Sequence, residues 1–419
     1  MTVQHTTSRR RFLATSAIGL TAPYFVPRSA FGANDRITTG HIGVGGQGLS
    51  NLGAFMGNAV AVCDVDSIHL AKAAKQVEAK NGKCEAFDDY RKMLERKDID
   101  AIVVSTPDHW HALATIHACQ AGKDVYCEKP LSLTVVEGRK MVEAARSNNR
   151  IVQTGSQQRS GDEFRKACEL VRSGRLGKLQ TILVGLPGSN FGGPPVPDSD
   201  PPAELNYDRW LGPAPQRPYN QKRVHYNFRF FWDYSGGQMT NFGAHHIDIA
   251  HWGMGMDDRG PLTVEGTASF HPEKWYEVTS ECRLTYTYPN NVTMTVGQSQ
   301  KGIPVGITFL GDKGKIFVNR GSLKSEPAEI IDQPLSGDDV HLFESKNHHQ
   351  NFLECMSSRK LPICDVEIGH RSATACHLGN IVARLGRKIE WDSAKEQIIG
   401  DDEATEMLSR PYRAPWTLG

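Results

Sequence analysis

The chain has 419 residues, more than one ordinary hydrophobic core accommodates, so we expect two domains. Its composition, 39% hydrophobic and 23% charged with a formal net charge of +1, is that of a globular protein and gives no reason to expect a nucleic-acid or anionic-membrane partner. The nine cysteines form no C-x-x-C pair, and their odd number argues against a complete disulfide framework, so most should be small buried apolar residues.

The first predicted feature along the chain is an export signal. Residues 8–13 read SRRRFL, the twin-arginine pattern, and an apolar run from Phe12 to Val26 follows. This run is too short and too mild to span a membrane stably. Small residues further on offer a cleavage site: Ala30, Gly32 and Ala33. We therefore predict a signal peptide over residues 1–33, export by the twin-arginine machinery to the periplasm or another extracytoplasmic location, and no stable membrane insertion. The alternative is a basic N-terminal helix of the mature fold.

From Arg36 to about Gly155, short apolar runs alternate with helical patterns. Strands are predicted at Ile37–Val44, Ala59–Cys63, Ala101–Ser105, Asp124–Cys127 and Ile151–Thr154. Helices are predicted at Gln47–Phe55, Ile68–Lys80, His109–Ala121 and Thr134–Ser147. Strands separated by helices indicate an α/β fold with a doubly wound parallel sheet, so residues 34–155 are expected to form a Rossmann domain.

After Gly155 the pattern changes. A helix (Glu163–Ser173) and a strand (Leu179–Leu186) precede a stretch, residues 187–202, in which nine of sixteen residues are Gly or Pro. A long irregular insert of this kind is expected to form part of a site wall. Leu284–Val296 alternates with period two around a turn, as antiparallel hairpins do. Further strands are predicted at Gly306–Leu310 and Lys315–Val318, and a late helix at about 367–385 is expected to pack back on the body. Residues 156–419 should therefore form an α+β domain around a mostly antiparallel sheet.

A glycine-rich turn is the first candidate site. Gly43, Gly45 and Gly48 have the G-x-G-x-x-G spacing between a predicted strand and helix, and Asp64 ends the next apolar run. Such glycines let the backbone approach a pyrophosphate, and the acidic side chain accepts the ribose hydroxyls. A tight turn beside an unrelated aspartate is the alternative. Because a carboxylate repels a 2′-phosphate, Asp64 favours NAD over NADP.

Glu128, Lys129 and Pro130 lie at the carboxyl end of a predicted strand, the edge where open α/β sheets bind ligands. A lysine desolvated beside a nicotinamide can act as acid or base toward a substrate hydroxyl. A surface lysine before a turn is the competing interpretation.

In this order, the glycine fingerprint, Asp64, "STPDHWH" and "EKP" resemble the Gfo/Idh/MocA oxidoreductases. The resemblance implies an open antiparallel sheet in the second domain, which closes the active site and often supports homo-oligomers. It also implies that Thr106, Pro107 and His111 lie near the nicotinamide, that Glu128 belongs to the cofactor side of the pocket, and that Lys129 is catalytic.

A third family motif falls on "GGQMTNFGAHHID", where Gly236, Gly237, Gly243, His245 and Asp248 match. The family's aspartate is replaced by Asn241, which cannot titrate. The resemblance therefore implies general-base work by His245, Lys129 or both, with Asn241 orienting. Asparagine here, with the preceding "FWDYSGG", is similar to the NAD-dependent α-N-acetylgalactosaminidases, a glycosidase branch of the same superfamily.

Two other groups invite a functional interpretation. Several histidines with Asp248 (His109, His111, His245, His246 and His251) suggest a metal, but their spacing does not place them on one helix face, so we expect none. The aromatic residues in 228–234 fit sugar stacking and core packing equally well.

Three functions compete: a sugar or polyol dehydrogenase that releases NADH, a redox-neutral enzyme on glycosides, and a binding protein that has lost catalysis. Retention of Lys129, His245 and Asp64 argues against the third. Free NAD is scarce outside the cytoplasm, so an export signal favours a cofactor that is carried out and recycled within each turnover.

Overall fold

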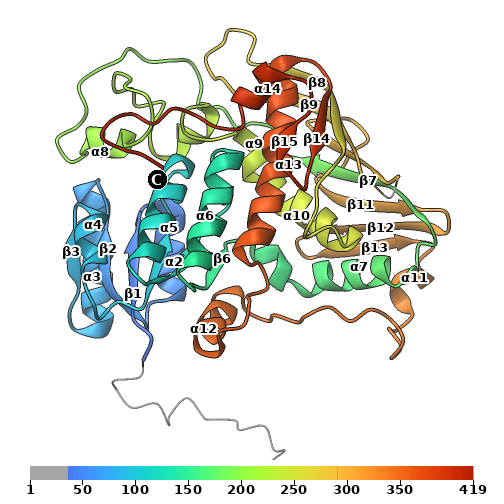
Figure 1. The fold of residues 1–419 in the computed structure, drawn as a ribbon, viewed down its shortest axis with the longest axis horizontal. Helices are drawn as coiled ribbons and strands as arrows, with labels where there is room; N and C mark the ends of the chain where they lie inside the picture. Colours follow the sequence, from blue (N-terminus) through green and yellow to red (C-terminus); the bar gives the residue numbers. More distant parts are fainter. Residues whose placement is uncertain (1–35, 290, 419) are drawn as a thin grey trace, which may run out of the picture. The chain divides into compact units, whose positions relative to one another are not determined.

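The computed structural model describes residues 36–289 and 291–418, and the predicted signal peptide lies outside them. Residues from Ile37 onward form one compact unit containing two sheets (Figure 1).

The first sheet is parallel, with strand order β3-β2-β1-β4-β5-β6. Its strands are β1 (Thr39–Ile42), β2 (Ala59–Cys63), β3 (Glu85–Phe87), β4 (Ala101–Val104), β5 (Asp124–Cys127) and β6 (Val152–Thr154). Its helices are α2 (Gly46–Ala54), α3 (Ser67–Asn81), α4 (Tyr90–Leu94), α5 (His111–Gln120) and α6 (Val135–Ser147). The expected doubly wound sheet is confirmed. The expected helix from His109 divides into a 3-10 turn, η2 (Asp108–Trp110), and α5.

Alternation along the strands fixes the two faces of this sheet. Ile42 and Val104 belong to a buried cluster with α5 and α6. Val62 packs with α2 and α3, and Val103 packs with residues of α12 (His348–Ser358). Helices therefore cover both faces, as runs of apolar residues within the strands require.

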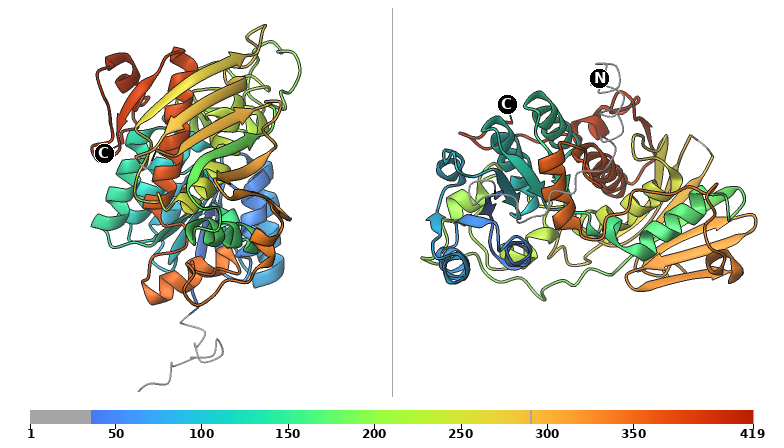
Figure 2. Two further views of the ribbon diagram at one scale, coloured as in Figure 1. Left: turned by 90° about the vertical axis from the view of Figure 1, so that its right-hand side faces the viewer. Right: turned by 90° about the horizontal axis from the view of Figure 1, so that it is seen from below.

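The second sheet has nine strands in the order β13-β12-β11-β7-β10-β9-β8-β14-β15, and only β7 and β10 pair in parallel among them (Figure 2). Its strands are β7 (Leu179–Leu186), β8 (Thr263–Phe270), β9 (Thr279–Thr287), β10 (Thr293–Gln298), β11 (Gly306–Gly311), β12 (Gly314–Asn319), β13 (Ser322–Glu326), β14 (Ile389–Asp392) and β15 (Gln397–Ile398). The mostly antiparallel sheet is thus confirmed.

Helices α7 (Asp162–Arg172), α10 (Gly243–Met254) and α13 (Val366–Leu385) pack on this sheet. Val184, Val296 and Phe309 point into the core that they enclose. On the opposite face, Leu183 lies beside Thr295 and Thr308.

The late helix contacts both sheets and a helix of the first. Helix α13 contacts α6 and β6 of the first half and β8 and β9 of the second sheet. Beyond it lies α14 (Asp402–Glu406), and near the chain end Trp416 packs edge-on against Trp110 at a centroid distance of 4.8 Å. The C-terminal segment therefore joins both halves.

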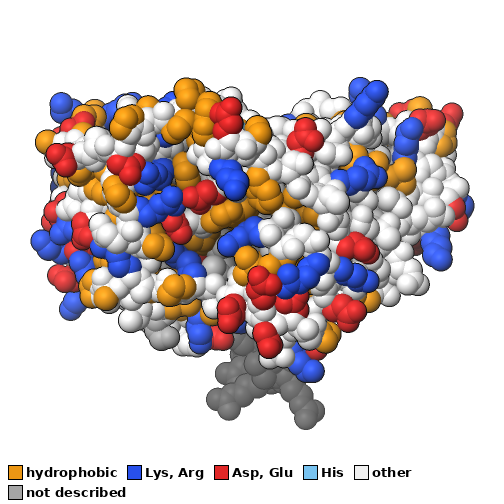
Figure 3. Space-filling view, turned by 90° about the horizontal axis from the view of Figure 1, so that it is seen from above, with side chains coloured by type: hydrophobic (Ala, Val, Ile, Leu, Met, Phe, Trp, Pro, Cys, Tyr) orange, Lys and Arg blue, Asp and Glu red, His pale blue; other side chains and the backbone are white. Residues whose placement is uncertain are grey.

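The remaining short helices are η3 (Gln157–Ser160), α8 (Tyr207–Leu211), η4 (His225–Phe230), α9 (Gly237–Asn241) and α11 (Glu329–Asp332). None of the helices in the described ranges has the length and apolar character needed to cross a bilayer. All nine cysteines lie in the described part and are free, and eight are buried, in line with their expected packing role. Acidic and basic side chains are interspersed on the face drawn in Figure 3.

Candidate active site

The glycine turn connects β1 to α2 at the carboxyl edge of the first sheet. Gly43 has φ +78°, and a Cβ there would lie 2.8 Å from the backbone nitrogen of Thr106. A Cβ at Gly48 would come within 1.9 Å of the Gly43 carbonyl oxygen, so both positions require glycine. Gly45, the N-cap of α2, supplies no side-chain cap, which leaves the helix amides free for a pyrophosphate.

Asp64 directly follows β2 and is held beside this turn. Its Oδ2 accepts a hydrogen bond from the Val44 amide (2.8 Å), and its Oδ1 accepts one from the Asp66 amide (2.9 Å). Burial raises the pKa of Asp64, while these two hydrogen bonds oppose the rise. Each oxygen keeps a further lone pair, so the carboxylate is fixed and can still accept from ribose hydroxyls.

A cavity of about 710 Å³ extends from the glycine turn to Lys129. The part of the chain that forms the first sheet and its loops contributes most of the expected lining residues: Gly43, Gly45, Asp64, Thr106, Pro107, His111, Glu128 and Lys129. Gly48 lies behind the turn and is not part of this lining. The Thr106 hydroxyl is buried and has no hydrogen-bond partner among the described residues, so it is available to a ligand. The free amides of α2, the glycine turn, the Asp64 carboxylate and the unpartnered Thr106 hydroxyl all fit NAD.

The second half of the chain covers the same cavity. Leu205, Trp210, His225, Tyr226 and Trp416 are among its lining residues. We call residues 204–230 the cover segment. It is fastened by backbone hydrogen bonds from Ser67 N to Glu204 O and from Asn206 N to Val65 O, both 2.9 Å. The Pro/Gly-rich stretch 187–202, expected to form a site wall, contributes no lining residue, because the wall is built by the segment that follows it.

His111 ties the Thr106–Pro107 loop to the residues after Lys129. Its Nδ1 lies 2.7 Å from the Pro130 carbonyl oxygen, and its Nε2 lies 3.0 Å from that of Thr106. Two carbonyl acceptors require both ring nitrogens to donate, so the imidazole is cationic. Burial alone lowers the pKa of His111, but Cys127, Asp108 and the Pro130 carbonyl outweigh it and raise the pKa to about 10. His111 is thus a fixed cation beside the expected nicotinamide position.

Lys129 and Asn241 meet at the centre of the site. The Lys129 Nζ donates to Asn241 Oδ1 at 2.8 Å and to the Asn241 carbonyl oxygen at 3.2 Å. Asn241 Nδ2 in turn donates to Gln238 Oε1 at 3.1 Å. Burial lowers the pKa of Lys129, and the Arg229 and Arg320 guanidiniums act in the same direction, while Glu128 and Asp108 oppose them. Asn241 therefore orients the lysine without supplying a countercharge.

His245, on α10, faces a second cavity of about 490 Å³ on the other side of Lys129. Its Nδ1 is buried and has no partner among the described residues. Burial lowers the pKa of His245 well below its usual value, and Lys129 and Arg320 lower it further. A neutral imidazole with a free ring nitrogen is suited to accept a proton.

Glu128 lies between the two cavities. Its Oε1 accepts hydrogen bonds from Asn51 (2.9 Å), Gln157 (3.1 Å) and Gln47 (3.3 Å). This network holds the carboxylate in place and thereby positions the start of the Lys129 backbone.

Three charged residues of the site were not among the expected ones. Asp108 is buried, accepts from the Ser235 hydroxyl, and has its pKa raised by burial. Arg229 lines the first cavity and Arg320 the second, and neither pairs with a described carboxylate. Asp108 lies inside the "STPDHWH" motif, so its position there was a usable signal, whereas nothing local marked the two arginines.

The histidines considered for a metal do not converge. His246 Nδ1 bonds to the Gly185 carbonyl (2.9 Å), and His251 Nε2 bonds to the Tyr288 hydroxyl (2.7 Å). Asp248 forms a buried two-pronged ion pair with Arg159 at 2.7 and 2.9 Å, so it holds helices together. The aromatic stretch divides: Phe230, Phe231 and Tyr234 pack in a core, whereas Phe228 lines the first cavity.

Comparison with known proteins agrees with this geometry. The oxidoreductase family's NAD-binding Rossmann fold (Gfo/Idh/MocA) matches residues 37–156, and its C-terminal α/β domain matches residues 188–418. Curated relatives include a glycosyl hydrolase family 109 protein 1 of Shewanella sp. (strain ANA-3), 30% identical over 173 residues, and the family 109 protein of Shewanella baltica (strain OS155), 31% identical over the same length. Each alignment covers 39% of this chain and 36% of the relative.

Solved structures share the fold at low sequence identity. The WlbA dehydrogenase from Bordetella pertussis, in complex with NADH and UDP-GlcNAcA, is 20% identical with a TM-score of 0.62, covering 85% of this chain and 99% of that one. An aldose-aldose oxidoreductase from Caulobacter crescentus, complexed with glycerol, is 18% identical with a TM-score of 0.62, covering 85% and 100%. The glycine turn and Asp64 lie where an NAD-binding Rossmann fold needs them, and the two family matches together account for most of the chain. The chain belongs to the Gfo/Idh/MocA oxidoreductase family.

Proposed function

We propose that this oxidoreductase acts on a glycoside in a redox-neutral cycle: a ring hydroxyl is oxidised, the glycosidic substituent is eliminated, water adds, and the ketone is reduced again. The cover over the cofactor cavity is the observation that carries this proposal. Asn241 in place of the family's aspartate and the relatives named glycosyl hydrolase family 109 support it. The competing function is a plain sugar dehydrogenase that releases NADH.

The residues that would hold NAD are those of the first cavity. The glycine turn and the free amides of α2 suit the pyrophosphate, Asp64 suits a ribose, and Thr106 offers a buried hydroxyl that has no partner among the described residues. When bound there, NAD would supply a hydride acceptor that later returns the hydride. Retention is favoured because the cover segment lines the cavity and is tied to residues 65–67 by backbone hydrogen bonds, and because the large side chains of Trp210 and Trp416 line the cavity as well.

The proton-handling groups are Lys129 and His245. Neutral Lys129, favoured by burial, accepts the proton of the substrate hydroxyl as the ketone forms, and Asn241 aims its Nζ. The ketone acidifies the neighbouring carbon, whose proton the neutral His245 accepts as the substituent leaves. Both groups return their protons when water has added and the ketone is reduced.

Export and self-association complete the proposal. The twin-arginine pattern at residues 8–13 would let the protein fold around its cofactor before it leaves the cytoplasm. Homo-oligomers would form through the outer face of the second sheet, where Leu183, Thr295 and Thr308 lie side by side.

Solvent deuterium tests the elimination step. Purified enzyme carrying its own nucleotide is incubated with an aryl glycoside in D2O, and the product sugar is examined by mass spectrometry and NMR. Deuterium at the carbon next to the transiently oxidised one is expected, because the proton held by His245 exchanges with solvent. The Lys129→Met variant serves as the inactive control. Aryl release without deuterium would indicate direct hydrolysis, and an accumulating keto sugar with NADH would establish the plain dehydrogenase; either would overturn the proposal.

A further inference from the structure

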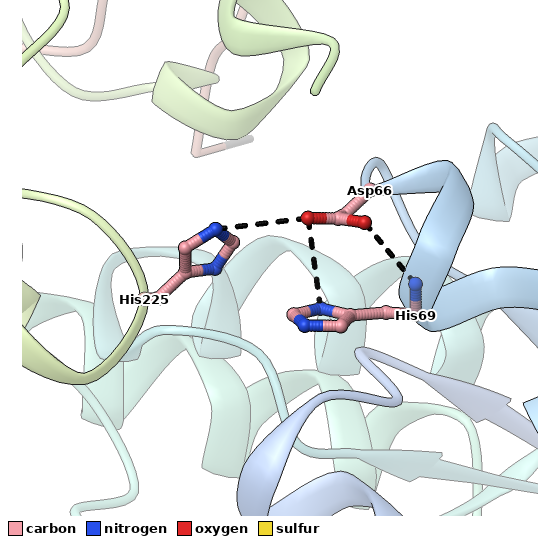
Figure 4. A group of neighbouring side chains, drawn as sticks. All are labelled: Asp66, His69 and His225. Carbon is pink, nitrogen blue, oxygen red and sulfur yellow. Dashed lines mark hydrogen bonds and ion pairs between the residues drawn. The ribbon is translucent and has the colours of Figure 1, made fainter. Parts of the chain in front are cut away.

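A compact group of Asp66, His69 and His225 lies on the wall of the cofactor cavity (Figure 4). Asp66 is the N-cap of α3, and its Oδ1 accepts from the amides of Ile68 (2.9 Å) and His69 (3.1 Å). This fixes the carboxylate and leaves Oδ2 directed toward the two imidazoles. His69 comes from the first turn of α3, whereas His225 belongs to the cover segment.

The spacing within this group fits metal coordination better than hydrogen bonding. Asp66 Oδ2 lies 3.6 Å from His225 Nε2 and 3.9 Å from His69 Nδ1, both beyond a good hydrogen bond. Ligand atoms about 2.0–2.1 Å from a tetrahedral zinc ion are about 3.3 Å apart. All three ligand atoms already lie within 4.8 Å of one another, so small side-chain rotations bring them to that spacing.

The backbone and the surroundings hold both imidazoles at this place. His225 has φ 50°, in the left-handed region that a histidine seldom occupies, which is a local strain of the kind found at functional sites. The His69 ring lies over the glycine turn, because a Cβ on Gly45 would be 3.1 Å from its Nδ1. The two rings meet edge to face at 5.1 Å.

We propose that Asp66, His69 and His225 bind a divalent zinc ion that fastens the cover segment to α3 at the edge of the cofactor cavity. Two imidazoles and one carboxylate are a ligand set that zinc accepts, with the fourth position open to water. The metal would link elements from the two halves of the chain, so it would slow opening of the cover. The metal site itself does not depend on the proposed reaction, and only its effect on retention rests on a bound cofactor.

Zinc binding to the full chain tests this proposal without any activity measurement. Enzyme stripped with a chelator is titrated with zinc chloride by calorimetry, and cobalt(II) is added separately to read the intense visible absorption of a tetrahedral site. We expect one zinc ion per chain, and affinity at least 100-fold weaker in both His225→Ala and His69→Ala. The matched control is His341→Ala, because His341 is exposed and lies outside the group.

Binding that is unchanged in both variants, or no stoichiometric binding at all, would overturn the metal site. If zinc fails to bind while His225→Ala weakens NAD binding, the imidazoles serve the nucleotide directly and the proposal is also wrong. Folding of each variant is checked by circular dichroism, and two independent ligand substitutions keep the test decisive if one variant fails to fold.

Discussion

Burial lowers the pKa of Lys129, and the side chain that it contacts, Asn241, is the position that differs from the family motif. The amide oxygen orients the ammonium at 2.8 Å without stabilising its charge as a carboxylate would. The motifs led to this pair from sequence alone, because EKP and the G-G-x-x-x-N motif are local patterns. Arg229 and Arg320, which also lower the pKa of Lys129, could not be found in this way. Their approach depends on tertiary packing of η4 and of the β12–β13 turn, which no local spacing records.

The Asn241→Asp variant tests this electrostatic role. A carboxylate 2.8 Å from Nζ favours the ammonium, so the pKa of Lys129 should rise. Neutral lysine would then be present only at higher pH, and the acidic limb of kcat/KM should move up by about one pH unit or more. Lys129→Met is the companion variant, expected to bind NAD normally and to lose roughly 100-fold or more in turnover. An unmoved limb in Asn241→Asp would exclude Lys129 as the titrating group.

At the scale of elements, strands with a continuous apolar or strongly alternating pattern were easier to predict than short or exposed strands. β2, β5 and β7 agree with the expected bounds because each is a continuous apolar or alternating run. β3 was missed because Glu85–Phe87 is three residues long at the sheet edge, with its first two residues exposed. β8 was missed because most of Thr263–Phe270 faces solvent or is only half buried, so alternation is weak. The pairing of β7 with β10 joins distant segments and has no local signature.

His111 joins the Thr106–Pro107 loop to Pro130, and its charge makes the stability of the fold depend on pH. Its pKa of about 10 in the folded protein exceeds the unfolded value of about 6.5. The stabilisation is therefore fully present below pH 6.5, declines as the pH rises, and is lost above about 10. His111→Asn should lower the free energy of unfolding by about 3 kcal/mol at pH 6, and the loss should shrink toward pH 10. Urea titrations at several pH values measure this, with His341→Asn as control. A pH-independent loss would show that His111 is neutral in the fold.

On the scale of the whole molecule, the cofactor cavity is assembled from four separated stretches: the part that forms the first sheet, the cover segment, residues 235–241 with Ser235 and Asn241, and the C-terminal tail. The Rossmann half could be expected from its fingerprint. The cover segment could not be expected from the sequence, because the Pro/Gly-rich composition predicts the site wall at residues 187–202. After Pro130, the next residue that lines the cavity is Leu205. Trp416, near the end of the chain, reaches the cavity by packing on Trp110.

Trp416→Ala tests whether this cover retains the cofactor. Removing the indole opens the cavity wall beside Trp110 and Arg91, whose guanidinium carbon lies 4.9 Å from the ring centroid. Dissociation of bound NAD should become about tenfold faster, as expected for loss of about 1.4 kcal/mol of packing. Dilution followed by fluorescence or filtration assays measures the rate. Phe343→Ala is the control, because Phe343 is 61% exposed and does not line the cavity. Equal rates in the wild-type protein and Trp416→Ala would mean that the cover does not limit release.

The most direct measurement of the central claim is the number of aryl groups released per bound nucleotide. Enzyme purified with its own nucleotide is given an excess of aryl glycoside and no added cofactor, while absorbance at 340 nm follows NADH. A retained, recycled NAD predicts many product molecules per active site with no accumulation of NADH. Product that stops at one equivalent per site until external NAD is supplied would contradict the account and establish net dehydrogenation.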